Sequence, residues 1–469
     1  MNILGNGKTC ERIDEMRSVF GQETQYIDLG DKRLNRRMET ILDQISQTPN
    51  SSIPESCKTM ASTKAAYRFF DSERVNVADI QAVNFQATSD RINAYPFVLV
   101  VQDTSELDFT SHRAIRGMGY LDNPYCYGMK IHTSFAVSPE GIPLGIIDQA
   151  DWIRDSKDYG KRHKRKQKQT SEKESQRWLT GVQNTEKRIG KSVAILTIAD
   201  READIYDLFA LPRQANHHLL IRGAHNRAMR GECKLLFEKV LETPIGARIE
   251  ITIGRNRERK GRQAQVEIRW VRVEIQPPRY RSQEHLPAIP LSAILIEEHE
   301  PPQGATPVRW FLLTTREITI AEDAQQCVRW YTMRWLIERY HYTLKSGCQI
   351  EELQLEDAER IRRALAIYCI VAWRLLYLTY LARYHPDQPS TDVLDKEELE
   401  ALSCFVRKSK QVPKRLPTLN ETIRMIAGLG GFLGRKGDGS PGVKVLWRGF
   451  RHLNDITMTY LLMKDVGNG

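Results

Sequence analysis

The chain has 469 residues, of which 41% are hydrophobic and 27% charged, a composition typical of a soluble globular protein with two or three domains. Lysine and arginine outnumber aspartate and glutamate, 69 against 59, which gives a net charge of +10 and a pI of about 9.1. The eight cysteines form no CxxC pair and no cluster with histidine at zinc spacing, which argues against a disulfide scaffold or a zinc finger.

Two features favour a cytoplasmic location. The first residues, MNILGNGKTCERIDEM, lack the apolar core of a signal peptide. The most apolar long segment, residues 364–380, contains Arg374 and is short for a membrane span, so a buried helix is the better interpretation. We therefore expect a cytoplasmic protein with no membrane partner, whose positive charge suits a polyanion such as nucleic acid.

Three segments near the N-terminus carry apolar residues at three- and four-residue spacing, which predicts helices. They span residues 13–20, 32–46 and 60–71. Arg33, Arg36 and Arg37 load the second segment with positive charge. Either a solvated helix face or a surface that contacts phosphate explains this charge.

Beyond Pro96 the pattern changes from helices to strands. FVLVVQD, residues 97–103, is a continuous apolar run that ends in an acid and predicts a buried central strand. Alternating segments at 130–137 and 144–150 predict antiparallel neighbours. A basic run at 157–168 predicts a surface loop, and a helix over 172–188 follows it.

A second buried strand, SVAILTIAD, ends at Asp200, and HHLLIRG near Leu219 predicts a third. From about residue 245 to 315 the chain reads as short alternating strands without a convincing helix. Within this region the apolar face switches between Trp270 and Val271, which predicts a β-bulge. Helices are expected from there to the C-terminus, with breaks near 386–389 and 428–442.

Two aspartates follow the predicted central strands. Sites in open α/β sheets form beyond the carboxyl ends of strands, where the sheet delivers side chains into a crevice. Asp103 and Asp200 both occupy such a position. An acid after a strand is more often a helix cap or a turn residue, so neither aspartate alone identifies a site.

A third acid belongs to the helical segment YTMRWLIERYHYTLK. Relative to Glu338, the residues Tyr331, Arg334 and Lys345 lie at −7, −4 and +7. At roughly 100° per residue these positions fall within an arc of about 60° on one continuous helix. That face would present an acid with two cations and a phenol, although a plain surface pair of Arg334 with Glu338 is the simpler alternative.

Taken together, the three acids predict a metal centre. Three carboxylates can hold two Mg²⁺ ions about 3.5–4 Å apart, with Mn²⁺ as a substitute. Clustered carboxylates repel one another unless a cation neutralises them, so the constellation implies a metal. Tyr331, Arg334 and Lys345 would then hold a phosphate group.

The motifs resemble those of a known family. AYRFF lies at 66–70, QDTSEL surrounds Asp103, EKESQRWL begins at 172, ADREADI surrounds Asp200, RWFLLT begins at 309, and LGGF lies at 429–432. With the Y-x2-R-x3-E-x6-K spacing around Glu338, the chain resembles the bacterial DDE cut-and-paste transposases of the Tn-five type, in the insertion-sequence-four group, over nearly its whole length.

The resemblance implies an α/β fold: a ribonuclease-H-like catalytic core with an antiparallel β insertion, flanked by N-terminal and C-terminal helical domains. We expect a DNA-binding domain at 1–75, a catalytic domain at 76–375 with the insertion at about 243–315, and a dimerisation domain at 376–469. In such a protein Asp103, Asp200 and Glu338 would be the catalytic residues and the ligands of two Mg²⁺ ions.

The implied activity is excision and insertion of a DNA element. Such enzymes bind the transposon ends in a synaptic homodimer and nick each end. The freed 3′-hydroxyl then attacks the other strand to form a hairpin, water opens the hairpin, and the ends are joined to target DNA. The partners are thus double-stranded DNA, as transposon ends and as target, and a second copy of the chain.

The resemblance also implies DNA contacts. Trp310 matches an aromatic that stacks on a base flipped out during hairpin formation, although core packing is the ordinary role of a tryptophan in a strand. Arg222 in LLIRG matches an arginine that contacts phosphate, and His341 falls inside the signature helix near the metals. The other candidates for DNA contact are Tyr331, Arg334, Lys345, Arg33, Arg36 and Arg37.

Two alternatives remain open. A related DNA-binding protein that no longer transposes would keep the DNA-binding features, but it has no physical need for three mutually repelling carboxylates. A metal-dependent phosphoesterase for small molecules would keep the acids. The basic surplus and the separate N-terminal helical region argue against that second alternative.

Overall fold

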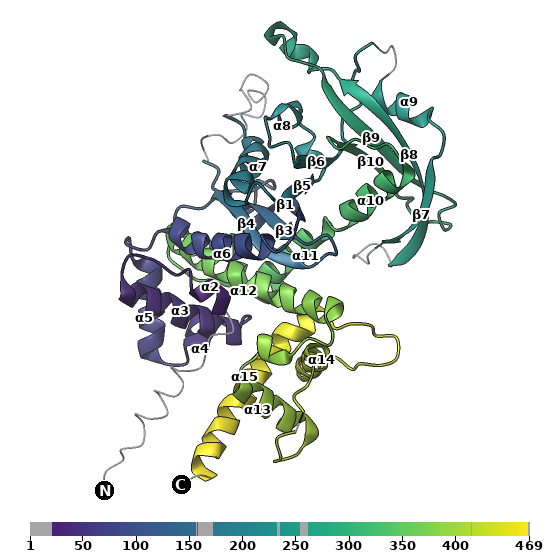
Figure 1. Cartoon of the computed structure of the whole chain (residues 1–469). Helices are drawn as coiled ribbons and strands as arrows, with labels where there is room; N and C mark the ends of the chain where they lie inside the picture. Colours follow the sequence, from purple (N-terminus) through teal and green to yellow (C-terminus); the bar gives the residue numbers. More distant parts are fainter. Residues whose placement is uncertain are drawn as a thin grey trace.

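The computed structural model describes residues 21–155, 157, 172–231, 235–253, 261–413 and 415–467. Within this part of the chain one ten-stranded sheet runs through the molecule, and helical regions adjoin its lower side (Figure 1). The strand order is β2-β3-β1-β5-β6-β10-β9-β8-β7, and β4 also pairs with β3. The predicted 13–20 helix lies outside the described residues, as does the basic run at 157–168 apart from Lys157.

The strands are β1 (Phe97–Asp108), β2 (Gly119–Tyr120), β3 (Tyr127–Val137), β4 (Pro143–Trp152), β5 (Ala194–Ala199), β6 (His217–Arg222), β7 (Ala247–Ile253), β8 (Arg262–Ile275), β9 (Ile289–Glu298) and β10 (Arg309–Thr314). β1, β5 and β6 are parallel to one another, whereas the other pairings are antiparallel. The fold is mixed α/β and consistent with a ribonuclease-H-like core, as predicted.

The helices are α2 (Gly21–Thr24), α3 (Lys32–Gln47), α4 (Ile53–Cys57), α5 (Met60–Asp71), α6 (Val77–Ile92), α7 (Gln176–Arg188), α8 (Tyr206–Ala210), α9 (Leu236–Leu241), α10 (Ala321–Thr332), α11 (Trp335–Tyr342), α12 (Ala358–Tyr384), α13 (Lys396–Arg407), α14 (Leu419–Leu429) and α15 (Val443–Gly467). Side chains that accept backbone N–H groups mark several starts, among them Asp31 at α3 and Thr59 at α5. The predicted helices at 32–46 and 60–71 are confirmed.

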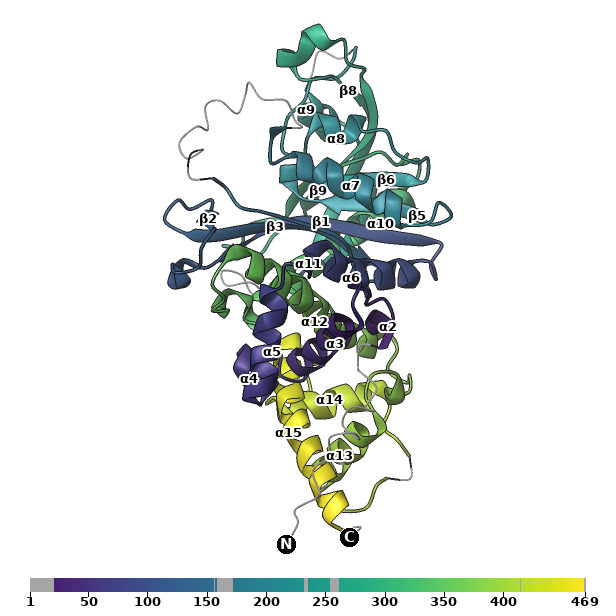
Figure 2. The same ribbon diagram turned by 90° about the vertical axis from the view of Figure 1, so that its left-hand side faces the viewer.

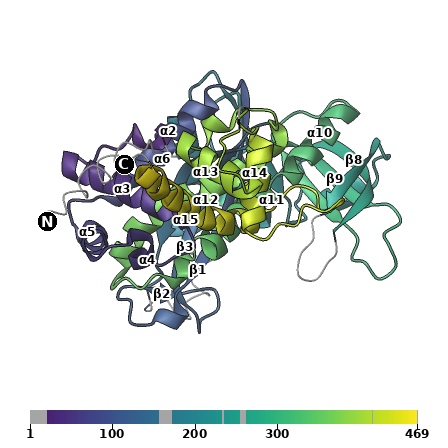
Figure 3. The same cartoon turned by 90° about the horizontal axis from the view of Figure 1, so that it is seen from below.

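Helices cover both faces of the central strands. α7 and α8 lie on one face, and α6, α11 and α12 lie on the other (Figure 2). From below, α12 and α15 cross beneath the sheet between the N-terminal helices and the β7–β9 region (Figure 3). The central strands are therefore enclosed by helices, as a parallel arrangement requires.

α12 is the core helix of the molecule. It is the one helix in the described residues that is long and apolar enough to cross a membrane, with a mean hydropathy of 1.7 over its most apolar window. That window is 83% buried, and α12 packs against α3, α5, α6, α14 and α15. The predicted buried helix at 364–380 is confirmed, and its apolar side chains are buried in the protein interior.

The predicted β-bulge at Trp270 and Val271 is wrong. The pairing of β8 with β9 continues without a register shift from Val266 to Ile275. The apolar face switches because the two halves of β8 are covered on opposite faces. Helix α10 lies against the first half and α9 against the second, so each half buries the side chains that face its own helix.

Candidate active site

Asp103 and Asp200 occupy matching positions on neighbouring parallel strands. β1 and β5 pair as far as Val101 and Ile198, and each aspartate lies two residues beyond that pair. Asp200 follows the end of β5 as predicted. Asp103 does not end its strand, because β1 continues to Asp108 while paired with β3 alone. The two acids thus lie where β1 and β5 separate.

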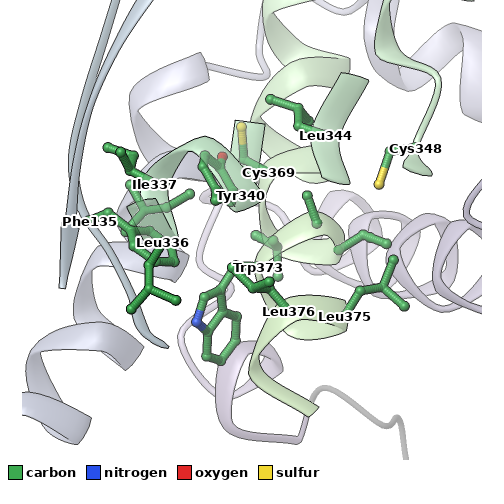
Figure 4. Packing of buried hydrophobic residues seen from close by; sticks show 14 of the residues in the cluster. Phe135, Leu336, Ile337, Tyr340, Leu344, Cys348, Cys369, Trp373, Leu375 and Leu376 are labelled. Carbon is green, nitrogen blue, oxygen red and sulfur yellow. The ribbon is translucent and has the colours of Figure 1, made fainter. Parts of the chain in front are cut away.

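Helix α11 carries Glu338 across the sheet to these acids. Its buried side chains, including Ile337 and Tyr340, pack against Phe135 of β3 and Cys369 of α12 (Figure 4). Tyr340 stacks on Phe135 with ring centroids 5.1 Å apart. This packing fixes the helical turn on which Glu338 lies, and the Glu338 side chain itself remains 31% exposed.

The signature residues do not share one continuous helix, so the prediction of a single helical face is wrong. α10 and α11 are separated by a two-residue turn that contains Arg334, whose N–H donates to the Tyr331 carbonyl at 3.1 Å. Tyr331 lies on α10, and Lys345 lies on a π-helical turn, Thr343–Gly347. Spacing in sequence could not reveal these changes of winding, which hydrogen bonds of a different span produce.

Acids and a cation share this site. Arg334 Nη2 lies 2.5 Å from Glu338 Oε1. The pKa of Asp103 is raised to about 7, first by burial, while Arg334 lowers it and the charges of Asp200 and Glu338 raise it. Burial also raises the pKa of Glu338, against the effect of Arg334. The charge of Asp200 therefore lies near enough to affect the pKa of both Asp103 and Glu338.

His341 of α11 lies against Asp103. It is 6% exposed, its Nδ1 lies 3.9 Å from Asp103 Oδ2, and its Nε2 lies 3.4 Å from Thr133 Oγ1. Burial and the nearby Lys345 lower its pKa to about 3, so the ring is neutral and its contact with Asp103 is not an ion pair. The structure places His341 against the acid rather than on an exposed surface.

Three further candidates lie close together near the acids. Trp310 is half-buried on β10 and meets the Tyr331 ring edge-on, with centroids 5.3 Å apart. Arg222 ends β6, and its Nη2 donates to the Arg309 carbonyl at 3.4 Å. The pKa of Tyr331 is raised by burial, against the charges of Arg334 and Arg222. An aromatic pair and two cations thus adjoin the carboxylates.

Lys345 lies on the turn that follows α11 and has a carboxylate partner. Its Nζ lies 3.1 Å from Glu351 Oε1, which also accepts the Asp108 N–H at 2.9 Å. Lys345 is thereby tied to the end of β1. The sequence interpretation did not identify Glu351, because a charged residue outside any motif carries no signal until the fold places it.

The arginines of α3 lie far from this site in the fold, on the N-terminal helices. The Arg33 side chain is 88% exposed and pairs with Asp31 at 3.2 Å. Arg36 is exposed and Arg37 is half-buried. The structure therefore separates these three cations from the carboxylates and presents two of them to solvent.

The donor chemistry of the acids suits a hard divalent cation, but their arrangement is not a closed ligand cage. In the part of the chain that the structure describes, no group of three or more His, Cys, Asp or Glu side chains is placed to hold a metal ion. Glu338 instead contacts Arg334. The charges of Asp200 and Glu338 nevertheless affect Asp103, and the three carboxylates are the type of oxygen ligand that Mg²⁺ prefers.

Two regions of the chain match known protein families. Residues 16–75 match a family described as transposase DNA-binding, and residues 370–459 match the transposase Tn5 dimerisation domain. Together they indicate a Tn5-type transposase. A DNA-binding region and a dimerisation region support a DNA transposase that binds DNA and forms a homodimer. The resemblance predicted from the motifs is confirmed at both ends of the chain.

EKESQRWL is one of the motifs that carry the resemblance, but the sequence alone assigns no role to its residues. EKESQRWL contains Arg177, which the structure places next to the acids. A cation in a motif shared with the family was the signal that could have identified it. What Arg177 contacts depends on the fold, because its partners Thr104 and Glu202 are distant in sequence.

Proposed function

We propose that Asp103, Asp200 and Glu338 are the catalytic carboxylates of this transposase and hold two Mg²⁺ ions, which Mn²⁺ can replace. The observation that carries the proposal is the convergence of the three acids. Two lie on adjacent parallel strands where these separate, and the third lies on a helix packed across the same sheet. Their mutual effect on the pKa of Asp103 supports it.

For metal binding, Glu338 has to exchange its contact with Arg334 for the ions. Arg334 would then be available for a DNA phosphate, for which its planar fork is suited. Bound metal ions would activate the attacking oxygen and stabilise the departing one. Tyr331, Arg222 and Lys345 border the same site and would hold the DNA backbone in place for the reaction.

The reaction we propose proceeds through a DNA hairpin. Water first breaks one phosphodiester at the transposon end and frees a 3′-hydroxyl. This hydroxyl attacks the opposite strand, and the flanking DNA leaves. Water opens the hairpin, and the 3′-hydroxyl then attacks target DNA. Trp310, beside Tyr331, would stack on a base that leaves the helix when the backbone bends.

We also propose that residues 1–75 bind the transposon ends, 76–375 catalyse, and 376–469 join two copies in the synaptic complex. The exposed Arg33 and Arg36 and the half-buried Arg37 of α3 would contact phosphates of the end DNA. His341, whose Nδ1 lies 3.9 Å from Asp103 Oδ2, would contact the DNA next to that acid.

The test is incubation of the full-length protein with the DNA that flanks its own gene, with and without Mg²⁺. Nicked and hairpin products that require Mg²⁺ are expected with the wild type and not with Glu338→Gln. The matched control is Glu352→Gln, which alters a glutamate that is 68% exposed and pairs with His112. DNA binding without any Mg²⁺-dependent product would instead favour a derivative that no longer transposes.

A further inference from the structure

Arg177 of α7 connects the segment of β1 that carries Asp103 with the turn that begins at Asp200. Its Nε donates to Thr104 Oγ1 at 2.8 Å, and its Nη2 donates to Glu202 Oε2 at 2.7 Å. Thr104 follows Asp103 on β1, and Glu202 lies in the turn after Asp200. One guanidinium therefore spans from β1 to the turn that follows β5.

Each residue that Arg177 holds is in turn bonded to one of the acids. The Thr104 N–H donates to Asp103 Oδ1 at 2.9 Å. The Glu202 N–H donates to Asp200 Oδ1, also at 2.9 Å. The guanidinium thus reaches both carboxylates by the same two-step route: a side-chain contact to a neighbour, and that neighbour's backbone N–H to the acid.

This connection replaces the sheet hydrogen bonds that are missing at the site. The pairing of β1 with β5 ends at Val101 and Ile198, before either acid. Beyond that pair, ladder hydrogen bonds no longer hold the two backbones at a fixed separation, and two carboxylate charges repel one another. A guanidinium that bonds to both β1 and the turn after β5 limits how far that repulsion can separate the two segments.

The guanidinium is itself held firmly. Its Nη1 donates to the Glu174 carbonyl of the preceding turn at 2.8 Å. Its central carbon lies 5.5 Å from the Trp152 ring centroid and 5.3 Å from that of Trp178. The Arg177 side chain is 11% exposed. A lysine could not reproduce this arrangement, because an ammonium lacks the planar fork that donates in several fixed directions.

We propose that Arg177 is a positioning residue that sets the separation of the Asp103 and Asp200 carboxylates for metal binding. The inference rests on the proposed function, because it needs those two acids to be metal ligands. It assigns to Arg177 no contact with the metal or with DNA. Residues that orient metal ligands typically change metal affinity or activity by about 10–100-fold when replaced.

The test measures Mn²⁺ binding and DNA cleavage separately. Binding is followed by the loss of the free Mn²⁺ electron paramagnetic resonance signal, with full-length protein and the DNA flanking its gene. Arg177→Lys should weaken Mn²⁺ binding about tenfold or more and lower kcat, while KM for DNA stays unchanged. A melting curve in EDTA should show a small change only.

Arg188→Lys is the matched control, because Arg188 lies on the same helix with similar contacts but far from the acids. Its Nη1 lies 2.5 Å from Asp148 Oδ1, and its central carbon lies 4.5 Å from the Phe85 ring centroid. The control should shift the melting curve without changing Mn²⁺ affinity. If Arg177→Lys behaves in the same way, Arg177 is only structural and the inference is overturned.

Variants of Thr104 test whether Arg177 acts on Asp103 through the Thr104 hydroxyl. Thr104→Ser keeps the hydroxyl and should retain wild-type Mn²⁺ affinity, whereas Thr104→Val should weaken it and add little when combined with Arg177→Lys. Additive losses in that pair would contradict a shared route. If the wild type binds no more Mn²⁺ than Glu338→Gln, the proposed function fails and the inference with it. Normal wild-type binding that Arg177→Lys leaves unaltered overturns the inference alone.

Discussion

Charged side chains are held in place where β1 and β5 separate, but they project into solvent from α3. At the carboxylate site Arg334 and Arg177 are 19% and 11% exposed and hold acidic partners at 2.5 and 2.7 Å. On α3 the Arg33 side chain is 88% exposed. Two regions of one basic protein thus use arginine under opposite physical conditions.

The difference reflects what each region is proposed to do. Phosphodiester chemistry needs groups held within a fraction of an ångström of a productive arrangement, which burial and pairing provide. Recognition of a DNA end needs cations that displace counterions and adjust to the backbone, which exposed side chains do. Changes at the two regions should therefore affect different measurements.

The largest effect is expected from Glu338→Ala. Removing a charged group that stabilises the transition state should lower the rate of nicking by about 10³-fold or more. DNA binding should remain close to that of the wild type, because the cations that we propose to contact DNA are unchanged. Equal losses in a gel-shift assay and in a single-turnover nicking assay would erase the distinction between the two regions.

An intermediate effect is expected from Trp310→Ala. Base stacking on an aromatic is worth about 1–3 kcal/mol, so hairpin formation should slow by roughly 5–150-fold while the first nick is nearly unchanged. Quantifying the two products over a time course measures both steps. Similar slowing of both would identify Trp310 as a core residue that packs against Tyr331.

A smaller effect is expected from α3. Arg33, Arg36 and Arg37 are each replaced by glutamine, one at a time. Each replacement should weaken end-DNA binding modestly and reduce the slope of log K against log salt concentration by about one. Single-turnover cleavage of saturated complexes should not change. A changed cleavage rate at saturation would show that α3 affects catalysis as well as DNA binding, and the two regions would then not differ in function.

The smallest effect on catalysis is expected from Glu398→Gln, which tests a buried acid outside the site. Burial raises the pKa of Glu398 to about 7 from an ordinary value of 4.5. The folded chain thus binds more protons than the unfolded chain between these values, and its stability falls as the pH rises through that window. Above pH 7 Glu398 is ionised in the folded chain too, so the loss of stability caused by its burial is then complete.

Glutamine removes that cost while it can still accept the Asp395 N–H that Glu398 Oε2 accepts at 3.0 Å. The variant should be more stable than the wild type by about 3 kcal/mol at pH 8 and hardly more stable near pH 4.5. Thermal unfolding across this range measures the difference. A stability difference that does not vary with pH would exclude ionisation of Glu398 as its cause.

Local patterns in the chain were sufficient for most elements and for the choice of the candidate site residues. Helices at 32–46 and 60–71 followed from apolar spacing, and the buried strands from apolar runs, because both are set by which side chains must leave water. Asp103, Asp200 and Glu338 were found by motif. Those motifs also indicated the family that the matches at 16–75 and 370–459 support.

Only the tertiary structure decided how these parts meet. It showed that β1 continues past Asp103, that Arg334 lies in a turn, and that β8 changes its buried face without a bulge. Two of these features depend on elements distant in sequence: β5 stops pairing before β1 ends, and different helices cover the two halves of β8. The turn at Arg334 is instead a local change of hydrogen bonding. A local pattern indicates which side chains are buried, but the element that covers them is determined by the whole fold.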